Sequence, residues 1–106
     1  MLYKINCIMY YLNIDGTKLK VYQDGMIMRK MKSNNWKEIE NNNNHVKGYN
    51  VILINKKQYM RSKIMAFAFL DKDLYDNSFF VCHKDNDKMN SSSDNLFIKN
   101  KLNKLK

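Results

Sequence analysis

The stretch Phe79–Ile98, FFVCHKDNDKMNSSSDNLFI, decides the fold of this chain. It holds two short apolar runs, 79–81 and 96–98, on either side of a polar segment, 82–95, that is rich in Asp and Asn. Apolar runs bounded by turn-forming residues predict two strands. Their connection is long for a hairpin, which indicates a functional loop. We expect the loop to be ordered, because Asp and Asn side chains can cap its backbone groups.

Upstream, residues 18–60 predict two β-hairpins. Apolar and polar residues alternate on both sides of Asp24-Gly25, a pair that favours a type I′ turn. A second alternating segment, 48–60, turns at 55–57. The side chains expected to face the core in the first hairpin are Val21, Ile27 and Met31.

Residues 60–73 change to a helical pattern, in which apolar residues recur at intervals of three and four. We expect an amphipathic helix with Ser62 as its N-cap. At the end of the chain, KNKLNKLK (99–106) predicts a short basic helix. The apolar stripe expected on the first helix consists of Met60, Ile64, Phe67 and Ala68.

The chain of 106 residues is expected to form one domain, 1–106, of the α+β class. Hairpins and one helix occupy approximately 18–70, and a strand–loop–strand unit with a short final helix occupies 79–106. Cys7 and Cys82 are too few for a disulfide framework and lack metal-ligand spacing, which indicates reduced thiols inside a cell. The N-terminal segment is too short to span a bilayer and has no cleavage signal, so we expect neither a membrane span nor secretion. The absence of proline and the many Asn and Lys residues indicate an AT-rich genome, as of a virus or organelle, and we expect a place in the cytoplasm or nucleoid of a host.

The formal net charge is +9, from 19 basic against 10 acidic residues. Such an excess favours nucleic acid, because basic side chains that neutralise phosphates release condensed counterions. The same net charge would also suit a protein whose charge only aids solubility, or one whose surface binds acidic protein or lipid. Trp36 is expected to be a half-buried anchor rather than a base-stacking platform. The residues expected to contact phosphate are Lys20, Arg29, Lys32, Lys56, Lys57, Arg61, Lys63, Lys99, Lys101 and Lys104.

His83 stands where the first predicted strand of the opening stretch meets its loop. An imidazole at a strand end can act as a general base, since its ordinary pKa lies near neutrality. The Asp and Asn residues that follow offer hard oxygen ligands for Mg²⁺ or Mn²⁺. They are equally suited to holding the loop together through hydrogen bonds to its backbone.

The order H-x-D-x-D-x-x-N-x-x-x-x-N-L over residues 83–96 resembles the signature of the HNH endonucleases of the ββα-metal group, in particular the phage and intron homing type. Upstream, KVYQDGMIM resembles the Y-x-V-S-x-x-G-x-V segment of that family. Residues 36–70 resemble its G-Y-x-x-V-x-L…V-H-R-L-V-A-x-A-F segment. The resemblance covers about Val21 to Ile98. It implies a protein that nicks DNA with Mg²⁺ or Mn²⁺, in which a histidine activates the water that attacks the phosphate.

On this resemblance the 79–106 unit is a ββα-metal-like motif with a truncated last helix. His83 falls on the general base, and Asn95 on the residue that braces the loop and orients that base. Cys82 and Asn103 fall on metal-binding positions. The loop-bracing positions are matched by Asp85 and Asn90.

The chain departs from the family pattern at three points. Cys82 replaces an Asp or Asn, and a thiol is a poor ligand for Mg²⁺. The histidine of V-H-R-L is missing at 61–64, and Asn103 reaches its position only if one residue is dropped after Leu96. Two functions stay open. One is a small nicking endonuclease; the other is a relative that binds DNA or RNA without cutting, with protein partners in a nucleoprotein or virion assembly. DNA is expected in preference to RNA.

Overall fold

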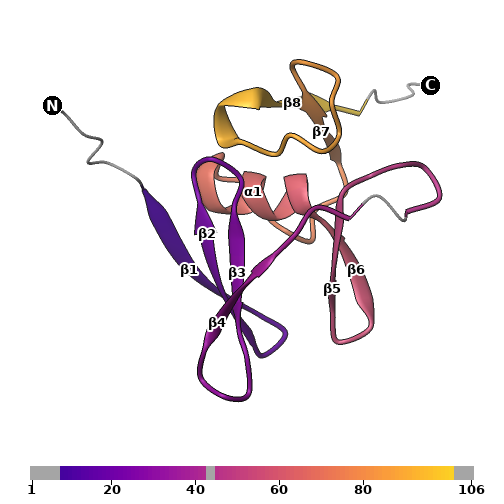
Figure 1. Cartoon of the computed structure of the whole chain (residues 1–106). Coiled ribbons are helices and arrows are strands. Elements are labelled where there is room, and N and C mark those ends of the chain that lie inside the picture. Colours follow the sequence, from indigo (N-terminus) through magenta and orange to yellow (C-terminus); the bar gives the residue numbers. More distant parts are fainter. Residues whose placement is uncertain (1–7, 43–44, 102–106) are drawn as a thin grey trace, which may run out of the picture.

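The computed structural model describes residues 8–42 and 45–101, which form an α+β arrangement of antiparallel hairpins around one α-helix (Figure 1). The coarse fold class predicted from the sequence is therefore confirmed. The strands make one four-stranded sheet, in the order β1-β2-β3-β4, and two separate hairpins, β5-β6 and β7-β8. The elements are β1 (Met9–Ile14), β2 (Thr17–Tyr22), β3 (Ile27–Lys30), β4 (Trp36–Ile39), β5 (Val51–Ile54), β6 (Lys57–Met60), α1 (Arg61–Phe69), β7 (Phe79–His83), the short 3-10 helix η1 (Ser93–Asn95) and β8 (Leu96–Asn100).

The turn between β2 and β3 differs from the predicted type I′ turn. The Tyr22 N–H donates to the Met26 carbonyl, which leaves a three-residue loop between the strands. Only Gly25, at φ +97°, takes the left-handed conformation, while the Asp24 carboxylate accepts a bond from the Met26 N–H. A type I turn followed by a left-handed glycine suits a three-residue hairpin. The hairpin prediction is thus confirmed, and the turn type was wrong.

Like the β1–β2 turn at Asp15-Gly16, the turn that links β5 to β6 has two left-handed residues. Asn55 and Lys56 have φ of +50° and +69°. The Asn55 amide also donates to the Asp15 carbonyl at 2.6 Å, which ties this hairpin to the β1–β2 turn. Ile52 and Ile54 are buried on the inner side of β5.

Helix α1 lies at the centre of the molecule and contacts β6, β7 and η1 (Figure 1). It does not follow the predicted stripe, because Met60 and Phe67 are 38% and 40% exposed. Ser62 is buried inside the first turn and is not the N-cap, a position that Met60 occupies without a side-chain hydrogen bond. A helix packed on several sides buries more than one stripe. Its fully buried side chains are Ile64, Met65 and Ala66.

The hydrophobic core lies between the four-stranded sheet, β5 and α1. Met31, predicted to face it, is 39% exposed just beyond the end of β3. The core residues are Ile14, Leu19, Val21, Ile27, Ile52, Ile54, Ile64, Met65, Leu74 and Leu96.

The C-terminal helix predicted over 99–106 is wrong at its start, because β8 continues to Asn100 as strand. The remainder of that prediction, with Asn103 and Lys104, lies outside the described residues. In the part of the chain that the structure describes, no helix is long and apolar enough to cross a membrane.

Candidate functional site

Strands β7 and β8 place His83 at the mouth of the loop. The two strands pair antiparallel, with His83 opposite Leu96 and Cys82 opposite Phe97. Side chains alternate along a strand, so His83 shares the face of Val81, which packs against the core. Cys82 belongs to the opposite face.

The loop after His83 is held by three side chains that bond to one another. The Asn95 amide accepts from the Asp85 N–H at 3.2 Å and donates to the Asp85 carboxylate at 3.0 Å. It also donates to the Asn90 carbonyl at 2.9 Å. The Asn90 amide in turn donates to the second oxygen of Asp85 at 2.9 Å. The three residues assigned to loop bracing and base orientation therefore form one connected network.

Asp85 is the electrostatic centre of this network. The amide of Asn90, then the N–H of Asp87 and the amide of Asn95 lower the pKa of the Asp85 carboxyl to about 2. Hydrogen bonds to the ionised form produce such a shift. At neutral pH the carboxylate is charged, and both its oxygens are engaged within the loop.

A contact with the β2–β3 turn fixes the far side of the loop. The Ser93 N–H donates to the Gln23 carbonyl at 2.9 Å. A Cβ atom on Gly25 would lie 3.0 Å from the Ser91 carbonyl carbon, so a side chain there would require the loop backbone to shift by a few tenths of an ångström. The Gly25 carbonyl accepts a bond from the guanidinium of Arg61 at 3.1 Å. The loop is thus attached to the four-stranded sheet and, through Arg61, to α1.

The His83 imidazole is partly buried, and its Nε2 atom is buried with no hydrogen-bond partner among the described residues. Burial lowers the pKa of His83, while Asp85 and Asp87 act in the opposite direction. The ring is therefore mainly neutral at pH 7 and able to accept a proton. Among the hydrogen bonds that the structure gives Asn95, none reaches His83. The Asn95 carbonyl instead accepts from the Lys84 N–H at 2.7 Å, so Asn95 acts as a positioning residue for the backbone that follows the histidine.

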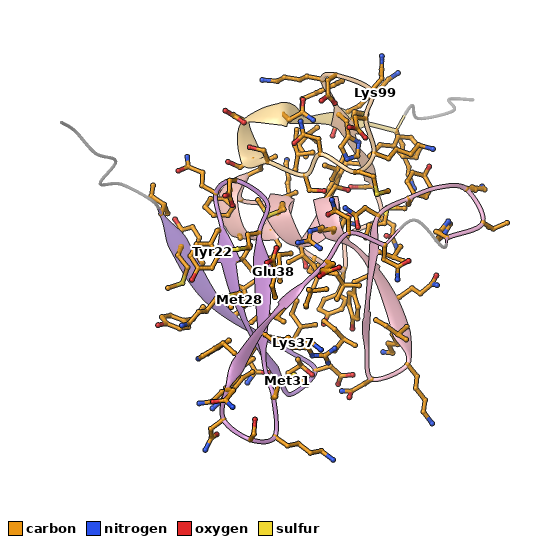
Figure 2. All side chains as sticks on the ribbon, viewed as in Figure 1. Tyr22, Met28, Met31, Lys37, Glu38 and Lys99 are labelled. Atoms are coloured by element: carbon orange, nitrogen blue, oxygen red, sulfur yellow. The ribbon has the colours of Figure 1, made fainter. Side chains whose placement is uncertain are left out.

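His83 lines an open groove of about 640 Å³ that also includes Cys82, Asn86 and Lys88. Lys88 donates to the Lys47 carbonyl at 2.9 Å, and its ammonium lies 4.4 Å from the centre of the Tyr49 ring. Lys88 was not predicted from the sequence, because its approach to the groove depends on the path of the loop. The groove is completed by aromatic and basic residues of the hairpin and its surroundings, including Phe80, Phe97 and Lys99. Figure 2 shows Lys99 at the end of the molecule formed by this hairpin.

The donors beside His83 do not match the needs of Mg²⁺ or Mn²⁺, which prefer several hard oxygen ligands. Cys82 offers only a partly buried thiol, on the opposite face of β7 from His83, and the Asp85 oxygens are occupied by loop hydrogen bonds. Across residues 8–42 and 45–101, no three His, Cys, Asp or Glu side chains gather as a metal site. Asn103, the other ligand implied by the resemblance, is outside the described residues.

The predicted phosphate contacts do not form one patch. Arg61 is 3% exposed and donates to the carbonyls of Gly25 and Glu40, so its assignment to nucleic acid is corrected: its guanidinium serves the fold. Lys63 donates to the Asp76 carbonyl at 2.7 Å, and burial lowers its pKa.

Lys20 lies in the middle of the four-stranded sheet on β2, and Lys104 is outside the described residues. The other predicted phosphate contacts fall at two ends of the molecule. The β3–β4 and β5–β6 turns project away from the β7–β8 hairpin (Figure 1). We call the residues near those turns the lower basic group: Lys18, Arg29, Lys32, Lys56 and Lys57. The groove group comprises Lys88, Lys99 and Lys101.

Comparison of the chain with protein-family models, with curated proteins and with solved structures found no match.

Proposed function

We propose that this protein binds nucleic acid, DNA in preference to RNA, on a scaffold of the HNH type, and that it cuts little or not at all with Mg²⁺. The network of Asp85, Asn90 and Asn95 behind a strand-end histidine carries this proposal. These are the loop positions matched by the HNH signature, and they hold one another in place. In this proposal β7, the loop, β8 and the residues after it correspond to a ββα-metal-like motif.

The charge distribution supports a phosphate backbone as the ligand of the groove. Lys88 and Lys99 line it, and the Lys101 ammonium lies 5.0 Å from the centre of the neighbouring Phe80 ring. Lysines beside an open groove can pair with successive phosphates without reading bases. Binding of this kind is electrostatic and has weak sequence preference. An intracellular nucleoprotein or virion assembly, with protein partners, would suit such a subunit.

The metal-ligand atoms available near His83 support the proposal that the protein does not cleave DNA efficiently with Mg²⁺. Phosphodiester hydrolysis with one metal needs a cation that stabilises charge on the leaving oxygen. Cys82 presents sulfur where a hard cation requires oxygen. We therefore expect that a supercoiled plasmid incubated with the protein and Mg²⁺ stays supercoiled while it is bound.

A nicking endonuclease is the second candidate, and one observation favours it. His83 is partly buried beside the groove with its pKa lowered by burial, which keeps a neutral base available at pH 7. The plasmid assay with Mg²⁺ and with Mn²⁺ separates the two candidates when wild type, His83→Ala and Cys82→Asp are run side by side. We expect weak or no nicking by wild type and the largest gain from Cys82→Asp. Robust nicking by wild type that disappears in His83→Ala would establish the enzyme instead.

A further inference from the structure

The face of the four-stranded sheet that points away from the core carries aromatic and basic side chains. Leu19, Val21 and Ile27 are fully buried on the inner face, so the residues that alternate with them point outward. Figure 2 shows Tyr22, Met28 and Glu38 distributed over β2, β3 and β4. We call this surface the outer sheet face. The residues on it that matter here are Tyr11, Lys18, Lys20, Lys30, Trp36 and Glu38.

Two aromatic rings from opposite edges of the sheet come together on the outer sheet face. Tyr11 belongs to β1 and Trp36 to β4, strands whose backbones lie roughly 14 Å apart at the usual strand spacing. Their ring centres are nevertheless only 6.3 Å apart. Both side chains therefore lean over the two central strands and form one aromatic surface. Tyr11 is 68% exposed, which is far from the buried anchor expected of a core aromatic residue.

Lysine ammonium groups surround these rings. The Lys20 Nζ lies 4.4 Å from the centre of the Trp36 ring and 5.8 Å from that of Tyr11. The Lys30 Nζ lies 5.8 Å from the Trp36 ring. Lys18 is exposed on the same face of β2, where Glu38 of β4 is the one acidic residue among those named above. The surface combines positive charge with flat apolar rings, and an unpaired nucleotide offers the complement of both.

We propose that the outer sheet face binds single-stranded nucleic acid, with bases stacked on Tyr11 and Trp36 and phosphates paired with Lys18, Lys20 and Lys30. This inference rests on the proposed nucleic-acid-binding function and assigns a second surface and a ligand class to it. A duplex is a poor occupant, because its bases are already stacked on one another. Stacking of a base on an aromatic side chain strengthens binding roughly 5- to 150-fold. An exposed cation–π contact strengthens binding only about 2- to 5-fold, so a base that competes for a ring displaces the Lys20 ammonium from it.

Trp36 is the only tryptophan of the chain, so its fluorescence reports this surface directly. The full-length protein is titrated with an oligothymidylate of about 12 nucleotides, within the site sizes of single-strand binding surfaces. An abasic oligonucleotide of the same length carries the phosphates without the bases. Anisotropy of the labelled strand measures affinity for wild type, Tyr11→Ala and the matched variant Tyr75→Ala. Tyr75 is 65% exposed and lies between α1 and β7, outside the sheet.

We expect oligothymidylate to quench Trp36 and the abasic strand not to. Tyr11→Ala should weaken oligothymidylate binding by roughly 5- to 150-fold, while Tyr75→Ala leaves it unchanged. Binding without quenching, or with equal affinity for both oligonucleotides and no effect of Tyr11→Ala, would overturn this inference and leave the groove proposal intact. Failure of the protein to bind either single-stranded or duplex DNA would reject both.

Discussion

Replacement of Asn95 by alanine tests the structural basis of the candidate site. The change removes two hydrogen bonds donated by the side-chain amide and one that it accepts. A typical hydrogen bond contributes about 1 kcal/mol net to stability. The bond to the Asn90 carbonyl is partly buried and should contribute in full, whereas water can replace much of the two exposed contacts with Asp85. We therefore expect Asn95→Ala to lower the free energy of unfolding by about 2 kcal/mol.

The loss is large enough for thermal unfolding to measure. In a domain of this size about 2 kcal/mol corresponds to a decrease in Tm of roughly 10 °C. Asn35→Ala is the matched control, because Asn35 is exposed in the β3–β4 turn and its side chain has no hydrogen bond within the described part of the chain. Asn95→Asp keeps the acceptor but loses both donors and adds a charge beside Asp85, so it should be no more stable than the alanine variant at pH 7. If Asn95→Ala and Asn35→Ala melt together, the network does not hold the loop.

Three further results are expected. Gly25→Ala should lower the free energy of unfolding by about 1–3 kcal/mol in urea titrations, more than Gly16→Ala, since both have positive φ but only Gly25 meets the Ser91 backbone. Arg61→Lys should cost about 1–3 kcal/mol in the same assay with an unchanged m-value, because an ammonium cannot replace the guanidinium fork that bonds two carbonyls. Ionised Asp85 should contribute fully to the free energy of unfolding above its unfolded pKa of about 4, and this contribution should be lost as pH falls toward 2, because its folded pKa is depressed. Asp85→Asn should flatten that part of the plot of stability against pH. An unchanged plot would contradict the pKa assignment.

Features that depend on local sequence were predictable. The hairpin at Asp24-Gly25 and the strands around the 84–95 loop follow from residues close together along the chain. The bracing role of Asp85 and Asn95 was expected from the resemblance to the HNH signature, and the two side chains are bonded to each other. The predicted turn type was wrong, because the Asp24 carboxylate accepts a bond from the Met26 N–H and only Gly25 in this turn is left-handed.

Features that depend on tertiary contacts were not predictable. Arg61 carries a charge that composition places on the surface, and only the approach of the β2–β3 turn explains its burial. Trp36 lies in β4, a four-residue strand whose pairing with β3 brings the ring toward β1. Had β4 been recognised, alternation would have placed Trp36, Lys30 and Lys20 on one face.

The salt dependence of duplex DNA binding tests whether the groove beside His83 binds a phosphate backbone. Two triple variants remove the same charge from opposite ends of the molecule. The groove variant replaces by glutamine Lys88, Lys99 and Lys101. The matched variant of the lower basic group replaces by glutamine Lys32, Lys56 and Lys57.

Each phosphate contact that is lost reduces the slope of log K against log salt by about 0.9 on duplex DNA. We expect a steep slope for wild type, a reduction of up to about 2.7 for the groove variant, and a smaller change for the matched variant. Affinity that does not respond to salt, or slopes that neither variant alters, would contradict this expectation.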